Sequence, residues 1–273
     1  MFIISLTSTP KRINRFILSL NYFIENLQKC RNFNKIIINI PKSYRRFNEE
    51  IKLNKESKNI LKKYKKKVII NKLDFDYGPL TKFIGGYRYL KSKNLKECGI
   101  LIIDDDIEYN NRYINSLINS APLSYICSGS GFNIVDDNYS PDKLSNITYV
   151  EGFSGIHMPS RLINPLLNQF AELYKCLLPV DKRDKEDIPQ ETLLACFMGD
   201  DYIISYLHKK KLWTQNNWRD NIRVLEYGLG QDALQNNNLF NSNMGTYNYI
   251  NDNEIVLRTW INKIKLNSHF MDY

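Results

Sequence analysis

Short apolar runs and segments of helical periodicity alternate along the first hundred residues. Four apolar runs predict buried strands, at 2–7, 35–40, 67–73 and 99–103. Apolar residues at helical spacing predict helices between them, within 8–28, 48–66 and 79–94. In the first helix, Thr9 is the expected N-cap and Pro10 the expected first helical residue. This alternation predicts an α/β fold, in which right-handed crossovers build a parallel sheet covered on both faces.

After residue 110 the pattern is looser. We expect strands at 123–129 and 147–152, and helices at 110–120, 159–176 and 189–210. The segment 133–146 is polar and turn-rich, and FSGIHM (153–158) is expected to form a loop. The chain has no internal repeat and no convincing linker. A length of 273 residues suits one large α/β domain or two small ones. The sequence therefore favours a single domain over 1–273, with its second half packed against the first.

The carboxyl ends of the predicted strands carry most of the candidate chemistry. Ligands of open parallel sheets bind beyond these ends. The loops LTSTPKR (6–12) and DFDYGPLTK (74–82) and the acidic run DDD (104–106) all fall there. Their shared location indicates a ligand site at this edge of the sheet.

Three consecutive aspartates follow the buried strand GILII. Side chains alternate along a strand, so we expect Asp104 and Asp106 on one side and Asp105 on the other. Two carboxylates on one side suit Mg²⁺ or Mn²⁺, which keep positions open for substrate phosphates. The alternative is an acidic N-cap for the following helix. One aspartate would serve as a cap, so three in a row favour a metal and nucleotide site.

The net charge of +9 indicates a polyanionic partner or a phosphate-bearing ligand. Much of the excess lies in KLNKESKNILKKYKKK (52–67), which we interpret as a solvated helix and loop in preference to a nucleic-acid surface. Five scattered cysteines without a CxxC pair argue against a disulfide framework or a zinc cluster. There is no signal-peptide pattern and no apolar stretch of the ~20 residues needed to span a bilayer. These features predict a cytoplasmic protein.

An apolar strand that ends in D-x-D resembles the nucleotide-sugar-dependent glycosyltransferases of the GT-A fold. The resemblance extends to four further segments, SLTSTPKRINRF (5–16), DYGPLTKF (76–83), VEGFSGIHMP (150–159) and MGDDYIISYLHKKK (198–211). The second is similar to a segment of GT-A enzymes encoded by large DNA viruses and of bacterial relatives. The resemblance implies one Rossmann-like GT-A domain with a mostly parallel sheet. Residues 1–110 would form its nucleotide-binding half, and residues 111–273 its acceptor and catalytic half.

The resemblance also implies roles for individual residues. The nucleotide of the donor would be bound by Thr7, Arg12, Asp76, Tyr77, Lys82, Asp104 and Asp105. Asp106, together with Asp104, would ligate Mn²⁺ or Mg²⁺. Acceptor contacts would come from Phe153, Ser154, Gly155 and Trp218. Some members supply a histidine as a further metal ligand, for which the candidates are His157, His208 and His269.

The acidic pair that opens the last predicted helix would supply the catalytic base. The commoner pair in the family is Glu-Asp, and this chain has Asp-Asp, so both Asp201 and Asp200 remain candidates. The helix N-terminus would help to keep Asp201 ionised. Lys82 has two interpretations of equal weight, as a phosphate contact or as a solvated position on an amphipathic helix.

Three functions are compatible with these residues. The main hypothesis is a metal-dependent, inverting glycosyltransferase that moves a sugar from a nucleoside-diphosphate donor, above all a UDP-sugar, to a hydroxyl of a glycan or glycoprotein. It needs no nucleic acid, and it would act in the host cytoplasm if the source is viral. A nucleotidyltransferase or nuclease would leave the segments GFSGIHM and GDD without a role. A basic binding module without activity would require lysines, not aspartates, at the ligand edge.

Overall fold

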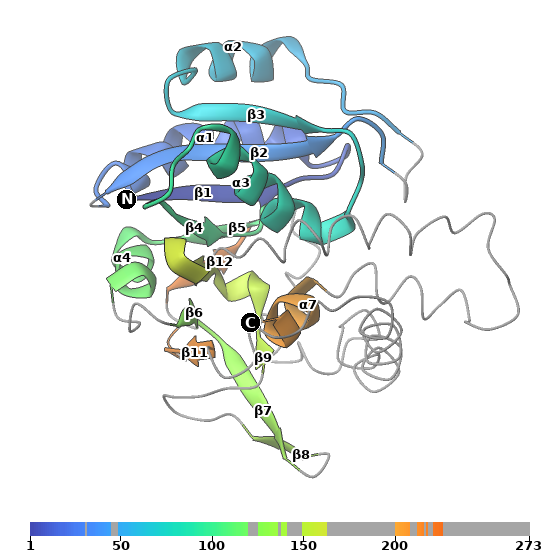
Figure 1. The fold of residues 1–273 in the computed structure, drawn as a ribbon. Helices are drawn as coiled ribbons and strands as arrows, with labels where there is room; N and C mark the ends of the chain where they lie inside the picture. Colours follow the sequence, from blue (N-terminus) through green and yellow to red (C-terminus); the bar gives the residue numbers. More distant parts are fainter. Residues whose placement is uncertain are drawn as a thin grey trace, which may run out of the picture.

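The computed structural model describes residues 1–30, 32–44, 49–119, 125–135, 138–140, 149–162, 200–207, 212–215, 217 and 221–225. A seven-stranded sheet forms its centre, with the strand order β11-β6-β10-β4-β1-β2-β3 (Figure 1). Four strands on one side of this sheet are mutually parallel: β1 (Phe2–Thr7), β2 (Phe33–Pro41), β3 (Val68–Leu73) and β4 (Gly99–Ile102). They coincide with the four apolar runs, so this part of the prediction is confirmed.

Strands from the second half of the chain continue the sheet beyond β4. They are β6 (Ile126–Ser128), β10 (Ile156–Met158) and β11 (Leu212–Thr214). β10 runs antiparallel to β4 and β6, and β11 runs parallel to β6. Two smaller sheets join β5 (Ile107–Tyr109) to β12 (Ile222–Val224), and β7 (Gly131–Val135) to β8 (Asn138–Ser140) and β9 (Tyr149–Val150).

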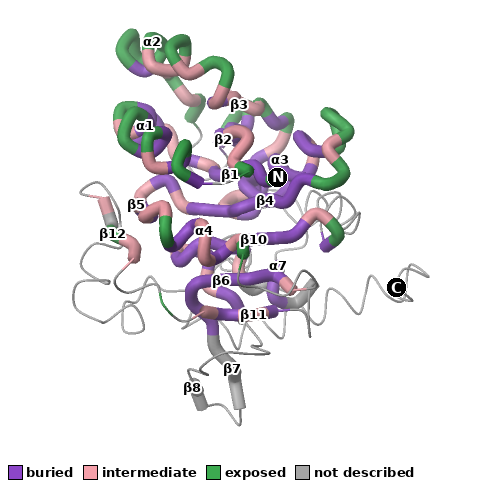
Figure 2. The backbone as a smooth tube through the Cα atoms, turned by 90° about the vertical axis from the view of Figure 1, so that its left-hand side faces the viewer, coloured by how far each residue is buried: buried purple, intermediate pink, exposed green. Residues whose placement is uncertain are grey.

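Helices cover both faces of the central sheet. α1 (Ile13–Leu27), α2 (Lys55–Lys63) and α4 (Asn111–Asn119) share one apolar cluster with Ile4 and Ile38 of the strands. α3 (Thr81–Ser92) and α7 (Asp200–Leu207) share the other cluster with Ile3 and Ile37. The inner strands are buried between these layers (Figure 2). The α/β class and the mostly parallel, helix-flanked sheet are thus confirmed.

Several element boundaries differ from the predictions. α1 begins at Ile13 with Arg12 in the N-cap position, so the predicted cap at Thr9 is wrong. A turn precedes the helix, closed by a 3.1 Å hydrogen bond from the Arg12 N–H to the Thr9 carbonyl. α2 begins at Lys55 because the Asn54 side chain accepts a 2.7 Å hydrogen bond from the third residue beyond it. The segment that forms strand β10 is predicted as a loop, and this prediction is wrong.

The second half is described only in part. The predicted strand at 147–152 is represented by β9 and by the 3₁₀ turn η2 (Gly152–Ser154). The predicted helix at 159–176 begins with the 3₁₀ turn η3 (Ser160–Leu162), and the rest lies outside the described residues. Within 189–210, the described part is the helix α7.

Helix α3 lies against the sheet through two consecutive glycines. A Cβ on Gly85 would stand 2.1 Å from Oδ1 of Asn39, and one on Gly86 would stand 2.7 Å from Oγ of Ser5. The Ser5 hydroxyl accepts a 2.8 Å hydrogen bond from Asn39 and donates one of 2.5 Å to the carbonyl of Lys82. These contacts fix the first turn of α3, which carries Lys82, against β1.

Candidate active site

The three aspartates follow the end of β4 and do not continue the strand. β4 ends at Ile102, and Asp105 and Asp106 occupy a turn. Asp105 and Asp106 both contact Arg12, whereas Asp104 contacts Lys82. The expected placement of Asp105 on the side opposite Asp106 is therefore wrong, because strand alternation has already ended. The joint role of Asp104 and Asp106 toward a metal remains a prediction.

The guanidinium group of Arg12 bridges two of the carboxylates. Its Nη2 lies 2.8 Å from Oδ1 of Asp105, and its Nη1 lies 2.6 Å from Oδ2 of Asp106. The hydroxyl of Ser8 donates to the other oxygen of Asp105. Burial raises the pKa of Asp105 to about 7, although Arg12 and the Ser8 hydroxyl oppose this shift. The side chain of Asp105 is 1% exposed and belongs to the interior of the turn, whereas that of Asp106 is 14% exposed.

Lys82 joins the end of β4 to the beginning of α7. Its ammonium nitrogen lies 2.6 Å from Oδ1 of Asp104 and 3.0 Å from Oδ2 of Asp200. The lysine side chain is buried, so its interpretation as a solvated helix position is wrong. Burial by itself would lower the pKa of Lys82, but Asp104, Asp200 and Asp201 together raise it well above the ordinary lysine value. Lys82 is therefore a buried cation shared by two acidic segments.

The two aspartates at the start of α7 have different surroundings. Oδ2 of Asp201 accepts a 2.8 Å hydrogen bond from the Gly152 N–H. Oδ1 of Asp201 is buried and has no hydrogen-bond partner among the described residues. Burial, and then the negative charge of Asp200, raises the pKa of Asp201 well above the ordinary aspartate value. The expected effect of the helix N-terminus, which favours ionisation, is outweighed.

The other residues expected on the nucleotide side are held by contacts inside the protein. Thr7 donates a 2.9 Å hydrogen bond to the carbonyl of Asn39. Asp76 is buried, and its Oδ1 accepts a 2.9 Å hydrogen bond from the Gly78 N–H. Tyr77 is fully buried. The roles of these residues toward a nucleotide remain predictions.

Two tyrosines hold the expected acceptor loop from the inside. The hydroxyl of Tyr109 donates a 2.8 Å hydrogen bond to the carbonyl of Phe153, and that of Tyr113 donates one of 2.6 Å to the carbonyl of Ser154. Gly155 follows with a φ of 82°, a conformation that favours glycine. The loop therefore has a fixed backbone beside the amide group that binds Asp201. An acceptor contact by its residues remains a prediction.

Of the candidate histidines, the structure describes His157, which lies away from the acidic cluster of Asp104, Asp105 and Asp106. His157 is buried in β10, and burial lowers its pKa to about 4. Its Nε2 lies 3.0 Å from the position that a Cβ would take on Gly99. Gly99 opens β4, whereas the aspartates follow the other end of that strand. His208 and His269, like the predicted acceptor residue Trp218, lie outside the described residues.

The acidic cluster supplies the hard oxygen ligands that Mg²⁺ and Mn²⁺ prefer. Asp104 and Asp106 are partly exposed, in contrast to Asp105, and fit this role. Within the described ranges, no group of three His, Cys, Asp or Glu side chains forms a metal site. An ion held by Asp104 and Asp106 would have further positions open to phosphate oxygens and water, as Mg²⁺ does in many nucleotide enzymes.

Sequence reasoning missed three contributors to this site. Ser8 lies inside the predicted nucleotide loop, but nothing in the pattern distinguished it from its neighbours. Tyr44 is buried and donates its hydroxyl to the carbonyl of Ser8, although it follows β2 without any motif. Gly152 belongs to the segment VEGFSGIHMP (150–159), but the sequence predicts no role for it. A Cβ at this position would stand 2.3 Å from Oδ1 of Asp201, so the site requires glycine there.

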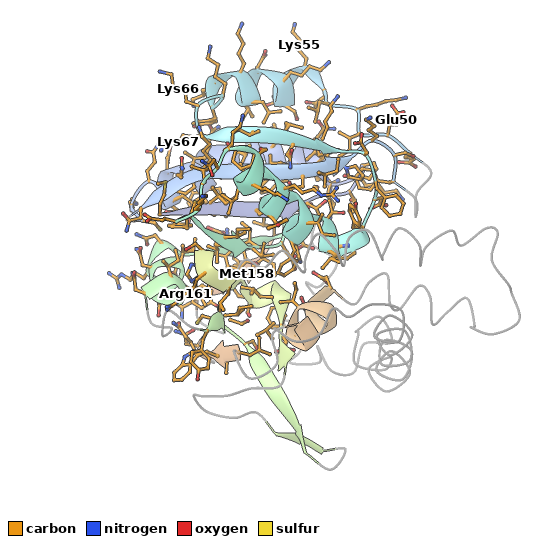
Figure 3. The ribbon with its side chains drawn as sticks, in the orientation of Figure 1. Glu50, Lys55, Lys66, Lys67, Met158 and Arg161 are labelled. Carbon is orange, nitrogen blue, oxygen red and sulfur yellow. The ribbon has the colours of Figure 1, made fainter. Side chains whose placement is uncertain are left out.

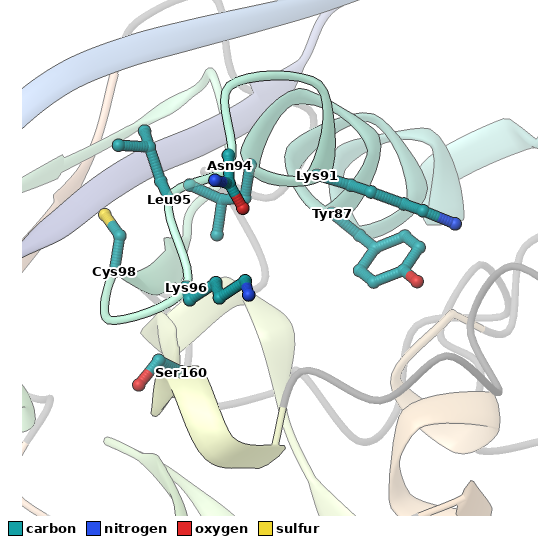
Figure 4. Close-up of a pocket in the computed structure, with 8 residues that line it drawn as sticks. Tyr87, Lys91, Asn94, Leu95, Lys96, Cys98 and Ser160 are labelled. Carbon is teal, nitrogen blue, oxygen red and sulfur yellow. The ribbon is translucent and has the colours of Figure 1, made fainter.

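A cavity of about 270 Å³ lies at the opposite end of β4 (Figure 4). Its lining includes Tyr87, Lys91, Asn94, Cys98 and Ser160. Cys98 precedes β4, whereas the aspartates follow it, so this cavity is separate from the acidic cluster.

No helix in the described part of the chain has the length and apolar character needed to cross a membrane.

Comparisons with known proteins find similarity to solved structures only. No family model and no curated protein sequence matches the chain. The galactosyltransferase LgtC, solved with donor and acceptor sugar analogues, is 10% identical with a TM-score of 0.40, over 78% of this chain and 72% of that one.

Two further structures show similar values. The bifunctional glycosyltransferase WbbM is 13% identical with a TM-score of 0.37, over 86% of this chain and 44% of that one. A structure named mannose-1-phosphate geranyltransferase, from Thermus thermophilus, is 9% identical with a TM-score of 0.36, over 77% of this chain and 68% of that one. At this level of similarity, none of them identifies a substrate or an activity for this chain.

Proposed function

We propose that this protein transfers a sugar from a nucleoside-diphosphate donor, above all a UDP-sugar, to a hydroxyl group of a glycan or glycoprotein acceptor. The observation that carries the proposal is the buried Oδ1 of Asp201, which has no hydrogen-bond partner among the described residues, on a carboxylate that the Gly152 N–H holds in place. Lys82 links the neighbouring Asp200 to Asp104, so this candidate base lies near the cluster of charged groups at the end of β4.

The charged groups at the end of β4 suit the departing nucleoside diphosphate. Negative charge develops on this leaving group as the bond to the sugar breaks, and fixed cations stabilise it. Arg12 and Lys82 are the cations that the fold provides beside the aspartates. A divalent ion held by Asp104 and Asp106 would supply further neutralisation of the diphosphate when bound.

The surroundings of the two aspartates favour Asp201 as the base. Burial raises the pKa of Asp200 as well, but the Lys82 ammonium group, 3.0 Å away, stabilises its charged form and opposes this shift. Asp201 has no such cation within hydrogen-bond distance in the described structure, and burial raises its pKa. A carboxylate with a raised pKa and a free oxygen can accept the proton of an acceptor hydroxyl as that hydroxyl attacks the sugar. One base and one direct displacement invert the configuration at the anomeric carbon.

A screen of nucleoside-diphosphate sugars tests the proposal. Each donor would be incubated with the protein and Mn²⁺, and thermal stabilisation and the release of free sugar would be measured. We expect one uridine donor to stabilise the protein and to be hydrolysed slowly when water replaces the acceptor. NMR of the transferred sugar should show the inverted anomeric configuration. Retention would contradict direct displacement.

Two variants test metal-dependent donor binding and the role of the base separately. Asp106→Ala should lose metal-dependent stabilisation by the nucleotide, because it removes an oxygen ligand. Asp201→Ala should keep that stabilisation and lose transfer. Release of pyrophosphate from a nucleoside triphosphate and a sugar phosphate, without hydrolysis of any nucleoside-diphosphate sugar, would instead identify a nucleotidyltransferase.

A further inference from the structure

Most of the net positive charge of the chain lies on one short helix and its flanks. Residues 52–67 contain eight lysines and one glutamate, so they hold seven of the nine net charges. Lys55, Lys58 and Lys62 share one helix face at i, i+3 and i+7, and all three are exposed. Lys55 extends from α2 away from the sheet (Figure 3). We call these three residues the basic surface.

The neighbouring helix α1 adds exposed apolar side chains. Leu18 is 39% exposed and Tyr22 is 56% exposed, and they lie one helical turn apart. Asn21, next to Tyr22, accepts hydrogen bonds from Nζ of Lys63 at 3.1 Å and from the hydroxyl of Tyr64 at 2.6 Å. The apolar pair therefore borders the lysine-rich segment. Exposed positions on both helices are visible in Figure 2.

A cavity of about 560 Å³ lies between α2 and the adjoining strands β2 and β3. Apolar side chains line part of it, including Ile40, Ile51 and Ile70, and charged groups line the rest, including Lys42, Lys52, Lys58 and Glu50. Lys58 belongs both to the cavity and to the basic surface, so the two are continuous. The combination of apolar and cationic groups suits an anionic group attached to an apolar body.

We propose that the α1–α2 side of the protein docks on an anionic phospholipid membrane and that the cavity receives a phosphate headgroup. Lysines near an anionic leaflet attract it electrostatically. Leucine and tyrosine side chains contribute by entering the interface between headgroups and acyl chains. A nucleic acid would also attract the lysines, but it would leave Leu18 and the apolar lining of the cavity without a partner. The basic surface shares no residue with the candidate active site, so this proposal stands independently of the proposed function.

Flotation of the full chain with lipid vesicles tests the proposal. The parent protein should bind phosphatidylcholine vesicles that contain about 30% phosphatidylglycerol, and not vesicles of phosphatidylcholine alone. Binding should weaken as salt rises from about 0.1 M to about 1 M, because the Debye length falls from about 10 Å to about 3 Å. Equal binding to both vesicle types, or none to the anionic ones, would overturn the proposal.

Two matched triple variants distinguish an effect of the basic surface from an effect of the net charge of the protein. Each lysine contributes about fivefold to membrane partitioning, so Lys55→Gln/Lys58→Gln/Lys62→Gln should weaken binding about 100-fold. Lys91→Gln/Lys93→Gln/Lys96→Gln removes the same charge from exposed positions on and after α3, and should bind as the parent does. Equal losses in both would overturn the proposal. Thermal unfolding and donor hydrolysis should be unchanged in both variants.

A third variant distinguishes a membrane from a nucleic acid. Leu18→Ser/Tyr22→Ser keeps every lysine, and it should weaken vesicle binding several-fold with the salt dependence unchanged. Binding of duplex DNA provides the comparison. Tighter binding to DNA than to anionic vesicles, unaffected by the Leu18 and Tyr22 substitutions, would identify a nucleic-acid surface and overturn the proposal.

Discussion

The backbone N–H of Gly152 donates a 2.8 Å hydrogen bond to Oδ2 of Asp201, and the same glycine leaves no room for a side chain beneath Oδ1. A Cβ at this position would stand 2.3 Å from Oδ1, so Gly152→Ala must displace the carboxylate or the loop. We expect a loss of about 1–3 kcal/mol in the free energy of unfolding, measured in urea. Sugar transfer should fall about 100-fold, because a small misplacement of a base is costly.

A double variant tests whether this contact is the cause. In an Asp201→Ala background the clashing oxygen is absent, so Gly152→Ala should cost much less stability than it does in the parent. The same cost in both backgrounds would show that the loop, and not the carboxylate, requires glycine.

Arg12 compensates the charge of a carboxylate that has almost no exposed surface. Arg12→Ala would leave Asp105 buried without its cation, which typically costs 3–5 kcal/mol, so we expect a loss of about 3 kcal/mol in unfolding free energy. Arg12→Lys should recover only part of it, because one ammonium group cannot match the two contacts of the guanidinium fork. The control is Arg15→Ala at an exposed position of α1, which should change stability by less than about 0.5 kcal/mol. Equal effects at both positions would contradict a structural role for Arg12.

The buried imidazole of His157 should make the fold sensitive to acid. Burial lowers its pKa from 6.5 to about 4, so the unfolded chain binds a proton at a higher pH than the folded chain does. The resulting stability is fully present above pH 6.5 and is lost as the pH falls toward 4, by about 3 kcal/mol in total. Urea unfolding of the parent and His157→Gln over this range isolates the effect, since the other groups titrate in both. Parallel pH profiles would contradict it.

Asp201 should set the acidic limb of the pH–rate profile. A base works in its deprotonated form, so transfer should rise with pH through the pKa of Asp201. Burial and Asp200 raise this pKa, so the midpoint should lie well above the value of about 4 that is usual for aspartate. The profile of kcat/KM measures it in the free enzyme. A rate that is already maximal near pH 4 would contradict the raised pKa.

The first half of the fold could be predicted because its signals are local. The apolar runs at β1 to β4 are bounded by polar segments, and the strand–helix alternation permits few arrangements. The residue at which α1 begins could not be predicted from local signals. Thr9 and Pro10 form a plausible cap, but the position of Arg12 is fixed by Asp105 and Asp106, more than 90 residues away. Strand β10 was missed because its pairing with β4 and β6 is also long-range.

In the candidate site, too, features set by the local sequence could be predicted, whereas features set by long-range contacts could not. The sequence indicated that Arg12, Lys82 and the acidic run meet at one sheet edge, and the structure brings them into contact. It contained no sign that Lys82 is buried, because the burial depends on the close approach of α3 to the sheet, where Gly85 and Gly86 meet side chains of β2 and β1. The same holds for Tyr44, whose role depends on a contact with the loop after β1.

Single-turnover transfer by the parent and by Asp201→Asn, with donor binding measured on the same preparations, tests the central claim most directly. Asparagine keeps an oxygen for the Gly152 N–H but cannot accept a proton from a hydroxyl group. The account predicts unchanged affinity for the nucleoside-diphosphate sugar and a rate of transfer at least about 100-fold lower. Equal rates in the two proteins would show that Asp201 is not the base, and the proposed chemistry of this site would then be contradicted.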